Sequence, residues 1–307
     1  MSAPRPAPLL QSWGWGEVQA RAGWRVERLR LAAGMASVQL RGRGRMEWGY
    51  VPRGPVPADA ASLGELVEWA RGRSLLRLRV EPEAGVELGA DLRRLGFRPS
   101  PFVQPQHTLI LTLGSEEQLL AGFKRGARYN VRLAERKGVQ VEVGRDADRM
   151  ARLAAASATR QRISLPSADY YRLLFEHLPG ARTYIASVDR VAVGGTLAVH
   201  FDGRGYDLYS GASGEHRELK PMYLIKWEAL RGALADGCGS YDLWGVSPGP
   251  DRSHPWYGLW EFKSGFGGEL VEYVGCWELV FDELRNRLDD ALERGRRRIR
   301  RVLNRVR

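Results

Sequence analysis

Two stretches of the chain alternate apolar and polar residues and then change to a helical period. Residues 24–52 contain the segments WRVERLRL, MASVQLR and WGYVP, and residues 182–213 contain RTYIASVD, RVAVGGTLAVHF and YDLYSGAS. Alternation separated by turns that contain Gly or Asp is typical of an antiparallel meander. Each stretch continues into a helix-period segment that carries a tryptophan, Trp69 or Trp227, and then into another short strand. The same order of elements is therefore predicted twice.

Three strands, a helix and a further strand, preceded by helices, form the order of the acetyltransferase-like fold. The pattern predicts an α/β (α+β) protein with two tandem GNAT-like domains and a cleft between them. At 307 residues the chain is long enough for two cores. We expect a first domain over residues 1–110, completed by a C-terminal helix over 276–307, and a second domain over residues 111–275.

A basic amphipathic segment introduces the second domain. Residues 115–138 begin with Ser115 and Gln118, the spacing of a capping box, and end at Gly138. Apolar residues recur every four positions along one side, and basic residues fall on another. The apolar set is Leu119, Phe123, Ala127 and Val131, and the basic set is Arg125, Arg128, Arg132 and Arg136. The segment predicts one amphipathic helix or two short ones with a basic stripe.

The positive charge is concentrated in two places. The net charge of the chain is +11, but residues 124–137 carry +5 and residues 294–307 carry eight arginines and no acid, so the remainder carries −2. Concentrated positive charge favours a polyanionic partner: a nucleic acid, a phosphorylated ligand or an anionic membrane surface. Only five of the 47 basic residues are lysines: Lys124, Lys137, Lys220, Lys226 and Lys263.

Several kinds of chemistry lack their residues. The five histidines are scattered without ligand spacing, and Cys238 and Cys276 form no CxxC pair, so we expect no metal and no disulfide framework. There is no GxSxG elbow and no phosphate-binding loop of the Walker type. No apolar run is long enough for a membrane span and no signal peptide is evident, so we expect a cytoplasmic protein.

Coenzyme A is also an unsuitable ligand. The fold binds it with a glycine-containing loop whose backbone N–H groups hold the pyrophosphate at the start of the central helix. The corresponding segments here are RGPVPADA (53–60), which has two prolines, and GEHRELKP (214–221), which has no glycine after Gly214. We therefore expect no bound cofactor.

Six segments in order resemble the Fem family of peptidoglycan bridge-forming aminoacyltransferases. They are QSWGWGEVQ (11–19), YVPRGPV (50–56), FKRGARYNVRLAERKGV (123–139), YDLYSGAS (206–213), YDLWGVSP (241–248) and FKSGFGGELVEYVG (262–275). The resemblance implies two acetyltransferase-like domains of the compact type without a helical arm. It also implies transfer of an amino acid from charged tRNA to the stem-peptide amine of UDP-MurNAc-pentapeptide or lipid II. Such a transfer starts from an activated ester, which needs positioning and oxyanion stabilisation more than a nucleophile.

The resemblance also implies the site residues. Lys263 is the lysine of the FK-x-GFGG segment and is expected at the reacting carbonyl or a precursor oxygen; as a lone residue it would be a solvated charge on a turn. The residues expected to bind substrate are Arg160, Arg162, Tyr170 and Tyr209. Many relatives place a lysine for the precursor's diphosphate where this chain has Gln19, and nearby Arg21 could substitute.

The basic segments are assigned to tRNA. The residues expected to contact its phosphates are Lys124, Arg125, Arg128, Arg132, Arg136, Arg297, Arg298 and Arg301. The arginine-rich tail is equally suited to peripheral contact with the inner membrane surface. We expect a monomer. Two alternatives stay open: an acyl-CoA-dependent N-acyltransferase and a non-catalytic nucleic-acid-binding protein. The transferred amino acid and the choice between a soluble and a lipid-linked acceptor are undetermined.

Overall fold

The computed structural model describes residues 6–161, 166–289 and 291. The chain divides into two compact domains. The first domain comprises Leu10–Gln104 and the chain from Tyr273 onward, and the second comprises the chain up to Leu9 together with Pro105–Glu272. The boundary drawn from the sequence between residues 110 and 111 falls inside the strand His107–Thr112, which belongs to the sheet of the second domain.

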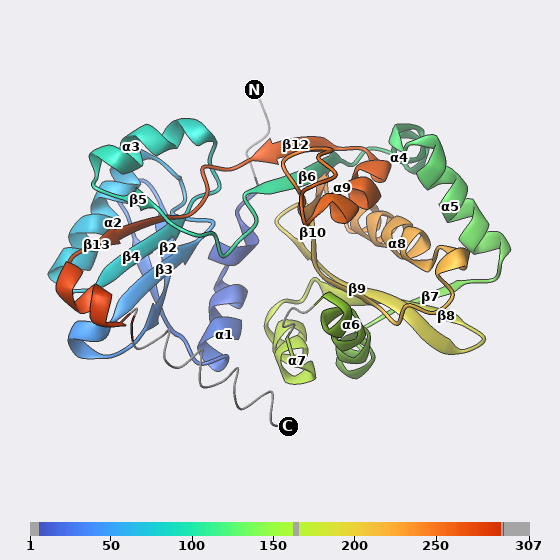
Figure 1. Cartoon of the computed structure of the whole chain (residues 1–307), viewed down its shortest axis with the longest axis horizontal. Coiled ribbons are helices and arrows are strands. Elements are labelled where there is room, and N and C mark those ends of the chain that lie inside the picture. The colour runs from blue at the N-terminus through green and yellow to red at the C-terminus, as the bar shows by residue number, and fades with distance from the viewer. Residues whose placement is uncertain (1–5, 162–165, 290, 292–307) are drawn as a thin grey trace. The chain divides into compact units, whose positions relative to one another are not determined.

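The first domain is built on a six-stranded sheet (Figure 1). The strands follow the order β1-β2-β3-β4-β13-β5, and β3 and β4 are its one parallel pair among the described residues. Its elements are η1 (Leu9–Gln11), α1 (Trp13–Arg21), β1 (Arg25–Arg30), β2 (Met35–Arg41), η2 (Gly44–Met46), β3 (Trp48–Pro52), α2 (Ala60–Gly72), β4 (Arg77–Glu81), η3 (Val86–Leu88), α3 (Gly89–Arg94), β5 (Arg98–Pro99) and β13 (Trp277–Val280).

The second domain contains a seven-stranded sheet in the order β12-β6-β11-β10-β9-β8-β7. Here β10 and β11 are the parallel pair, and the other described pairs are antiparallel. Its elements are β6 (His107–Thr112), α4 (Glu116–Gly122), α5 (Arg125–Arg136), β7 (Gln140–Gly144), α6 (Ala147–Gln161), α7 (Ala168–His177), β8 (Ala181–Val188), β9 (Val191–Phe201), β10 (Arg204–Ala212), η4 (Arg217–Leu219), α8 (Pro221–Ala235), β11 (Ser240–Gly245), α9 (Tyr257–Lys263), η5 (Ser264–Phe266) and β12 (Glu269–Glu272).

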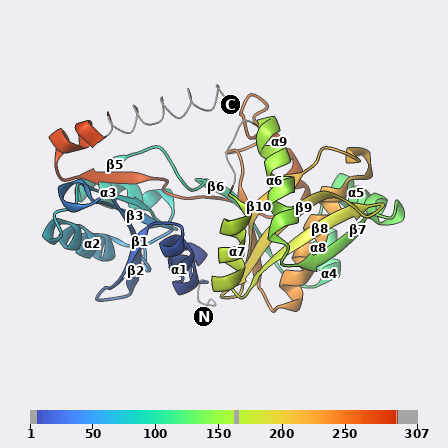
Figure 2. The same ribbon diagram turned by 90° about the horizontal axis from the view of Figure 1, so that it is seen from below.

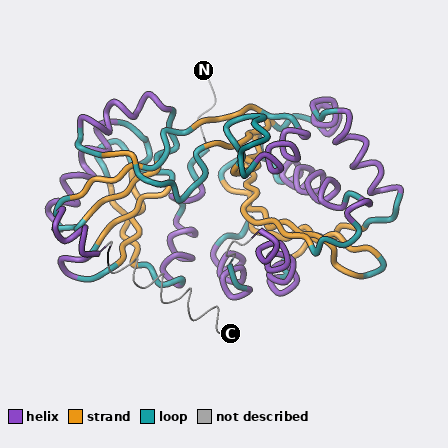
Figure 3. The backbone as a smooth tube through the Cα atoms, in the orientation of Figure 1, coloured by secondary structure: helices purple, strands orange, loops and turns teal. Residues whose placement is uncertain are grey.

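The predicted repeat is confirmed. In each domain an antiparallel meander is followed by a helix and by a strand that lies parallel to the last meander strand: β1–β3, α2 and β4 in the first, and β8–β10, α8 and β11 in the second. A parallel neighbour requires a crossover connection, which the helix supplies. Figures 1 and 3 show the second sheet with α5 and α8 over one face and α6 and α7 over the other.

Local capping explains where two of these helices begin. Ser12 accepts a hydrogen bond from the backbone N–H of Trp15 at 3.1 Å, and α1 starts beside it. Ser115 and Gln118 form the predicted capping box at the start of α4. The basic segment is confirmed as two short helices, α4 and α5, which Figure 2 shows from another side. Its apolar residues are buried as the period predicted.

The segment from residue 276, predicted as helix, begins instead as a strand. Residues Trp277–Val280 form β13, which pairs with β4 on one side and β5 on the other, and residues 283–289 are helical. The WELV alternation places Trp277 in the core of the first domain and leaves Glu278 to pair with Arg79. A position between two strands, which the local sequence does not reveal, makes this short segment extended.

Candidate functional site

The candidate site lies where β10 and β11 separate. The two strands pair only over Arg204–Tyr206 and Ser240–Asp242, although β10 runs on to Ala212 and β11 to Gly245. Both strands are irregular just beyond this point, β10 between Asp207 and Tyr209 and β11 between Asp242 and Gly245. Irregularities of this kind bend a strand and re-aim its side chains. An opening therefore forms in the middle of the sheet.

The irregularity in β10 sends its polar side chains to opposite faces. Asp207 and Ser210 share one face, where the Ser210 hydroxyl lies 3.3 Å from the Asp207 carboxylate. The Asp207 carboxylate also forms a buried ion pair with Lys226 of α8. Tyr209 faces the other side, where its ring packs against Tyr170 and Tyr171 of α7. One extra residue in the strand thus separates an ionic cluster from an aromatic one.

The irregularity in β11 is held by a buried carboxylate. Asp242 Oδ1 accepts hydrogen bonds from the Thr108 hydroxyl and from the backbone N–H of Trp244, the latter at 2.7 Å. Trp244 adopts a left-handed conformation with φ of +62°, which is uncommon for a non-glycine residue. Gly245 follows, and a Cβ there would lie 2.7 Å from the Pro105 ring, so any larger residue would force Pro105 to shift. This arrangement presents the Gly245 carbonyl to the opening.

Lys263, the last residue of α9, points at that carbonyl. Its Nζ donates a hydrogen bond to Gly245 O at 2.9 Å, and the side chain is half-buried. Desolvation lowers the pKa of Lys263 from 10.5 to about 8, with the Lys226 ammonium acting in the same direction and the Asp207 and Asp242 carboxylates opposing it. At neutral pH this ammonium is charged yet incompletely compensated, so it interacts strongly with negative charge that develops nearby.

A pocket of about 520 Å³ surrounds these groups. Its polar lining includes Asp207, Ser210, Ser157 and Lys263, and its apolar lining comprises Pro105, Leu208, Met222, Trp244, Trp256, Leu259 and Phe262. A pocket of this size, with apolar walls and a few convergent polar groups, is suited to a small organic ligand. With one ammonium against the opening, the pocket can bind an acyl group and stabilise an oxyanion on its carbonyl.

The segment after Lys263 is tied to the start of the basic helix. Lys124, which precedes α5, donates from its ammonium to the Ser264 hydroxyl at 3.0 Å and from its backbone N–H to Gly265 O at 2.8 Å. Gly267 has φ of +82°, and a Cβ on it would lie 2.9 Å from the carbonyl oxygen of Gly122. These contacts place Lys124, which was predicted to bind tRNA, beside the segment that follows the pocket lysine.

The tyrosines predicted to bind substrate lie together. Tyr170 and Tyr209 pack edge to face with ring centroids 6.3 Å apart. Burial and a hydrogen bond with Tyr170 raise the pKa of Tyr209 well above its ordinary value, so its hydroxyl stays protonated. Arg160 falls in α6, but its side chain lies outside the described residues, as does Arg162.

The remaining predicted residues lie elsewhere. Gln19 and Arg21 belong to α1 of the first domain, where Gln19 is buried and Arg21 is exposed. Arg125, Arg132 and Arg136 are exposed on α5. Arg128 turns back, and its guanidinium donates to carbonyl oxygens at the end of α4, including Leu120 O at 3.2 Å. Arg297, Arg298 and Arg301 lie outside the described residues.

The three charged residues that act on Lys263, here called the ionic cluster, were missed by sequence reasoning. They are Asp207, Lys226 and Asp242. Two signals were available. The motifs YDLYSG and YDLWGV place an aspartate at the same position of neighbouring strands, and Lys226 is one of the rare lysines. With Lys124 and Lys263, three of the five lysines lie at or beside this site.

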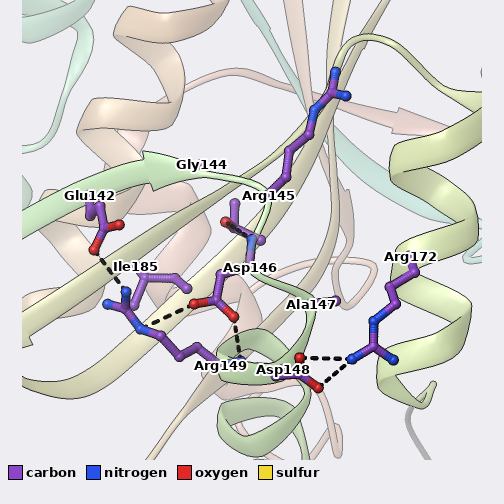
Figure 4. A pocket seen from close by; sticks show the side chains of 10 residues that line it. Glu142, Gly144, Arg145, Asp146, Ala147, Asp148, Arg149, Arg172 and Ile185 are labelled. Atoms are coloured by element: carbon purple, nitrogen blue, oxygen red, sulfur yellow. Dashed lines mark hydrogen bonds and ion pairs between the residues drawn. The ribbon is translucent and has the colours of Figure 1, made fainter.

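A second cavity, of about 380 Å³, lies at the start of α6 (Figure 4). Its charged groups pair with one another. Arg172 reaches from α7 to the Asp148 carboxylate at 2.7 Å, and Arg149 pairs with Glu142 at 2.8 Å. These groups are largely exposed, and pairs of this kind contribute little. The cavity is a solvated salt-bridge network, so we place the candidate site at the first pocket.

No cluster of three or more His, Cys, Asp or Glu side chains that could hold a metal ion occurs among the described residues. Within the same residues, no helix combines the length and apolar character needed to cross a bilayer.

The fold and site define a protein with two tandem GNAT-like domains and a pocket lysine in the second. The structure matches the crystal structure of FemX with a TM-score of 0.81 at 20% sequence identity, covering 93% of this chain and 95% of that one. A tandem GNAT protein from the clavulanic acid biosynthesis pathway matches at a TM-score of 0.51 and 15% identity, covering 81% and 79%. These similarities confirm the predicted fold class.

The family follows from the sequence comparison. The model of the FemAB family matches residues 86–190 and 177–294, which together exceed half of the chain. The chain belongs to the FemAB family, as the resemblance predicted. Similar curated proteins include the lipid II:glycine glycyltransferase of Staphylococcus haemolyticus, 21% identical over 90% of this chain and 88% of the relative. The enzyme of the same name from Staphylococcus aureus (strain USA300) is 22% identical over the same shares.

Proposed function

We propose that this protein is an aminoacyl-tRNA-dependent transferase that adds an amino acid to the stem-peptide amine of a peptidoglycan precursor. The observation that carries the proposal is the half-buried Lys263 ammonium, held at Gly245 O in the pocket where β10 and β11 separate. Membership of the FemAB family and relatives named as lipid II:glycine glycyltransferases support the reaction class and a lipid-linked acceptor.

The proposed reaction needs no nucleophilic side chain. The acceptor amine attacks the ester carbonyl that joins the amino acid to the tRNA, and a tetrahedral oxyanion forms. Lys263 stabilises this charge, and the bond between the carbonyl carbon and the tRNA oxygen then breaks as the amide forms. The proton that the attacking nitrogen loses balances the proton that the departing tRNA oxygen gains to become a hydroxyl. The apolar pocket walls around Trp244 and Phe262 lower the local dielectric constant and so strengthen the electrostatic effect of the ammonium.

Features of the central helix favour an aminoacyl ester over coenzyme A as the donor. α8 begins with Pro221, which has no N–H to offer a phosphate. Just before it, the backbone N–H groups of Leu219 and Lys220 donate to His216 O and Arg217 O. An acyl-CoA enzyme of this fold needs free backbone N–H groups here to bind a pyrophosphate. In this chain those N–H groups are either missing or already bonded to the chain's own carbonyl oxygens.

The direct test is transfer in solution. The protein is incubated with glycyl-, alanyl- or seryl-tRNA and with lipid II or UDP-MurNAc-pentapeptide, and the products are weighed by mass spectrometry. We expect a product heavier by one amino acid residue, whose mass identifies the residue transferred. If every donor and both acceptors yield no product while acetyl-CoA raises the melting temperature, the acyl-CoA alternative replaces this proposal.

Lys263→Met tests the role of the site. Loss of an oxyanion-stabilising group reduces kcat by roughly 100- to 1000-fold. Arg94→Met, which removes an exposed positive charge on α3 of the first domain, is the control and should transfer at nearly the normal rate. Equal rates for the two variants would assign Lys263 no part in the reaction.

A further inference from the structure

The exposed face of α5 carries an aromatic residue among its arginines. Tyr129 is 58% exposed, so much of its ring is available for contact with a ligand. It follows Arg125 by four positions and precedes Arg132 by three and Arg136 by seven. Residues spaced by three and four positions share one side of a helix. Tyr129 therefore stands within the basic stripe, in the place that the sequence pattern had given to Arg128.

Tyr129 takes the place of Arg128 in the exposed stripe because α4 and α5 are separate helices. Arg128 is withdrawn from the stripe, since its guanidinium satisfies carbonyl oxygens at the end of α4. Ala127, Val131 and Ala134 are buried on the side of α5 that packs against α8. This packing turns Tyr129 and the three arginines to the solvent.

The arginines of the stripe lack the partners that arginines elsewhere have. Arg172 and Arg231 are held by carboxylates of neighbouring elements at 2.7 and 2.9 Å. No described carboxylate forms an ion pair with Arg125, Arg132 or Arg136. Unpaired guanidinium groups spread over three turns of a helix, about 16 Å, present a row of donors to a polyanion.

The composition of the exposed face of α5 favours a nucleic acid over a membrane surface as its partner. A helix that lies on a membrane presents an apolar side to the lipid chains beside its basic residues. The apolar side of α5 is buried in the domain, so only the Tyr129 ring would remain for a membrane. Stacking on an aromatic ring, with cations at the phosphates on either side, is instead how proteins hold single-stranded nucleic acid.

We propose that Arg125, Tyr129, Arg132 and Arg136 form an RNA-binding stripe in which the Tyr129 ring stacks on an unpaired nucleobase and the arginines contact the flanking phosphates. The inference rests on the proposed function in one respect, that the RNA is the charged tRNA. It adds the part of the RNA that is recognised, an unpaired nucleotide, and the residue that recognises it.

The test measures binding by fluorescence anisotropy with uncharged tRNA, a short single-stranded oligoribonucleotide and the same oligoribonucleotide as a duplex. Tyr129→Ala should weaken binding to the single strand by about 5- to 100-fold, the range that stacking of one base supplies, and change duplex binding little. Tyr129→Phe keeps the ring and should bind as the parent does. Arg132→Ala should weaken binding to all three RNAs and reduce the salt dependence by about one phosphate contact. Arg94→Ala, an exposed arginine of α3, is the charge control.

Each outcome decides the proposal. If Tyr129→Ala binds the single strand within twofold of the parent, or if the stripe variants lose binding to anionic vesicles but not to RNA, the stripe is not an RNA site. Tyr129-dependent RNA binding by a protein that transfers no amino acid would remove the proposed function and keep this inference. Normal transfer by Tyr129→Ala with an unchanged KM for charged tRNA would remove this inference and keep the proposed function. The substituted side chains are exposed, so unchanged melting temperatures should show that every variant is folded.

Discussion

Lys263→Met should make the protein more stable while it slows transfer by roughly 100- to 1000-fold. If Lys263 served packing alone, its replacement would destabilise the protein. A lysine that is kept for chemistry instead lowers the stability of the folded protein. The cost is visible in the surroundings of Lys263, where burial lowers the pKa to about 8 even though Asp207 and Asp242 lie near enough to oppose the shift. Methionine has a similar length and no charge to desolvate.

The size of the effect follows from the structure. A pKa of about 8 in place of 10.5 corresponds to roughly 3.5 kcal/mol against the charged form, at about 1.4 kcal/mol per pKa unit. The hydrogen bond from Nζ to Gly245 O is lost in the variant, which offsets about 1.5 kcal/mol of this gain. The net stabilisation at pH 7 is therefore about 2 kcal/mol. For a domain of this size it raises the melting temperature by roughly 4 to 8 °C.

Thermal melts of Lys263→Met and the parent protein from pH 7 to pH 10 measure both the size and the sign. The folded-state pKa is lower than the unfolded one, so the penalty is fully present below pH 8. Between pH 8 and 10.5 the unfolded parent holds a proton that the folded parent has released, and the stability of the parent rises with pH relative to the variant. The advantage of the variant should shrink across this window.

Two results would refute this reasoning. A lower melting temperature for Lys263→Met at pH 7 would mean that the lysine contributes to the fold. A difference that stays constant from pH 7 to pH 10 would mean that the ammonium is not desolvated. Lys137→Met, from an exposed position, should change the melting temperature by less than about 1 °C at every pH.

Three further predictions follow, two for the second domain and one for the first. Lys226→Met should lower the unfolding free energy by about 3–5 kcal/mol in urea titrations, because it leaves the buried Asp207 carboxylate without its partner, and adding Asp207→Asn should recover most of that loss. Asp242→Asn keeps both hydrogen bonds of Oδ1 but removes a charge that raises the pKa of Lys263, so the alkaline limb of the transfer-rate profile should move to lower pH. Asp242→Ala also removes the two hydrogen bonds and should lower kcat at every pH. Cys276 is buried and its thiol pKa is raised, so 5,5′-dithiobis-(2-nitrobenzoate) should modify it only after denaturant is added.

The repeated element order could be predicted because its signals are local. Each strand and helix turns one face to a core, so apolar residues recur every two positions in the meanders. In α2 and α8 they recur every three to four positions. The capping box at Ser115 is equally local. The strand Trp277–Val280 could not be predicted in this way, because its conformation depends on β4 and β5, which lie about 180 to 200 residues earlier.

The sequence by itself determined the two-fold order of elements, the concentration of charge on α5 and in the tail, and Lys263 as a rare lysine in a motif rich in glycine. Only the tertiary structure decided what surrounds that lysine. The ionic cluster joins Asp207, Lys226 and Asp242 from three elements, and irregularities in two strands aim them. Such irregularities arise from how neighbouring strands pair and separate, and a side chain's charge environment depends on the distances that result, which no period along the chain encodes.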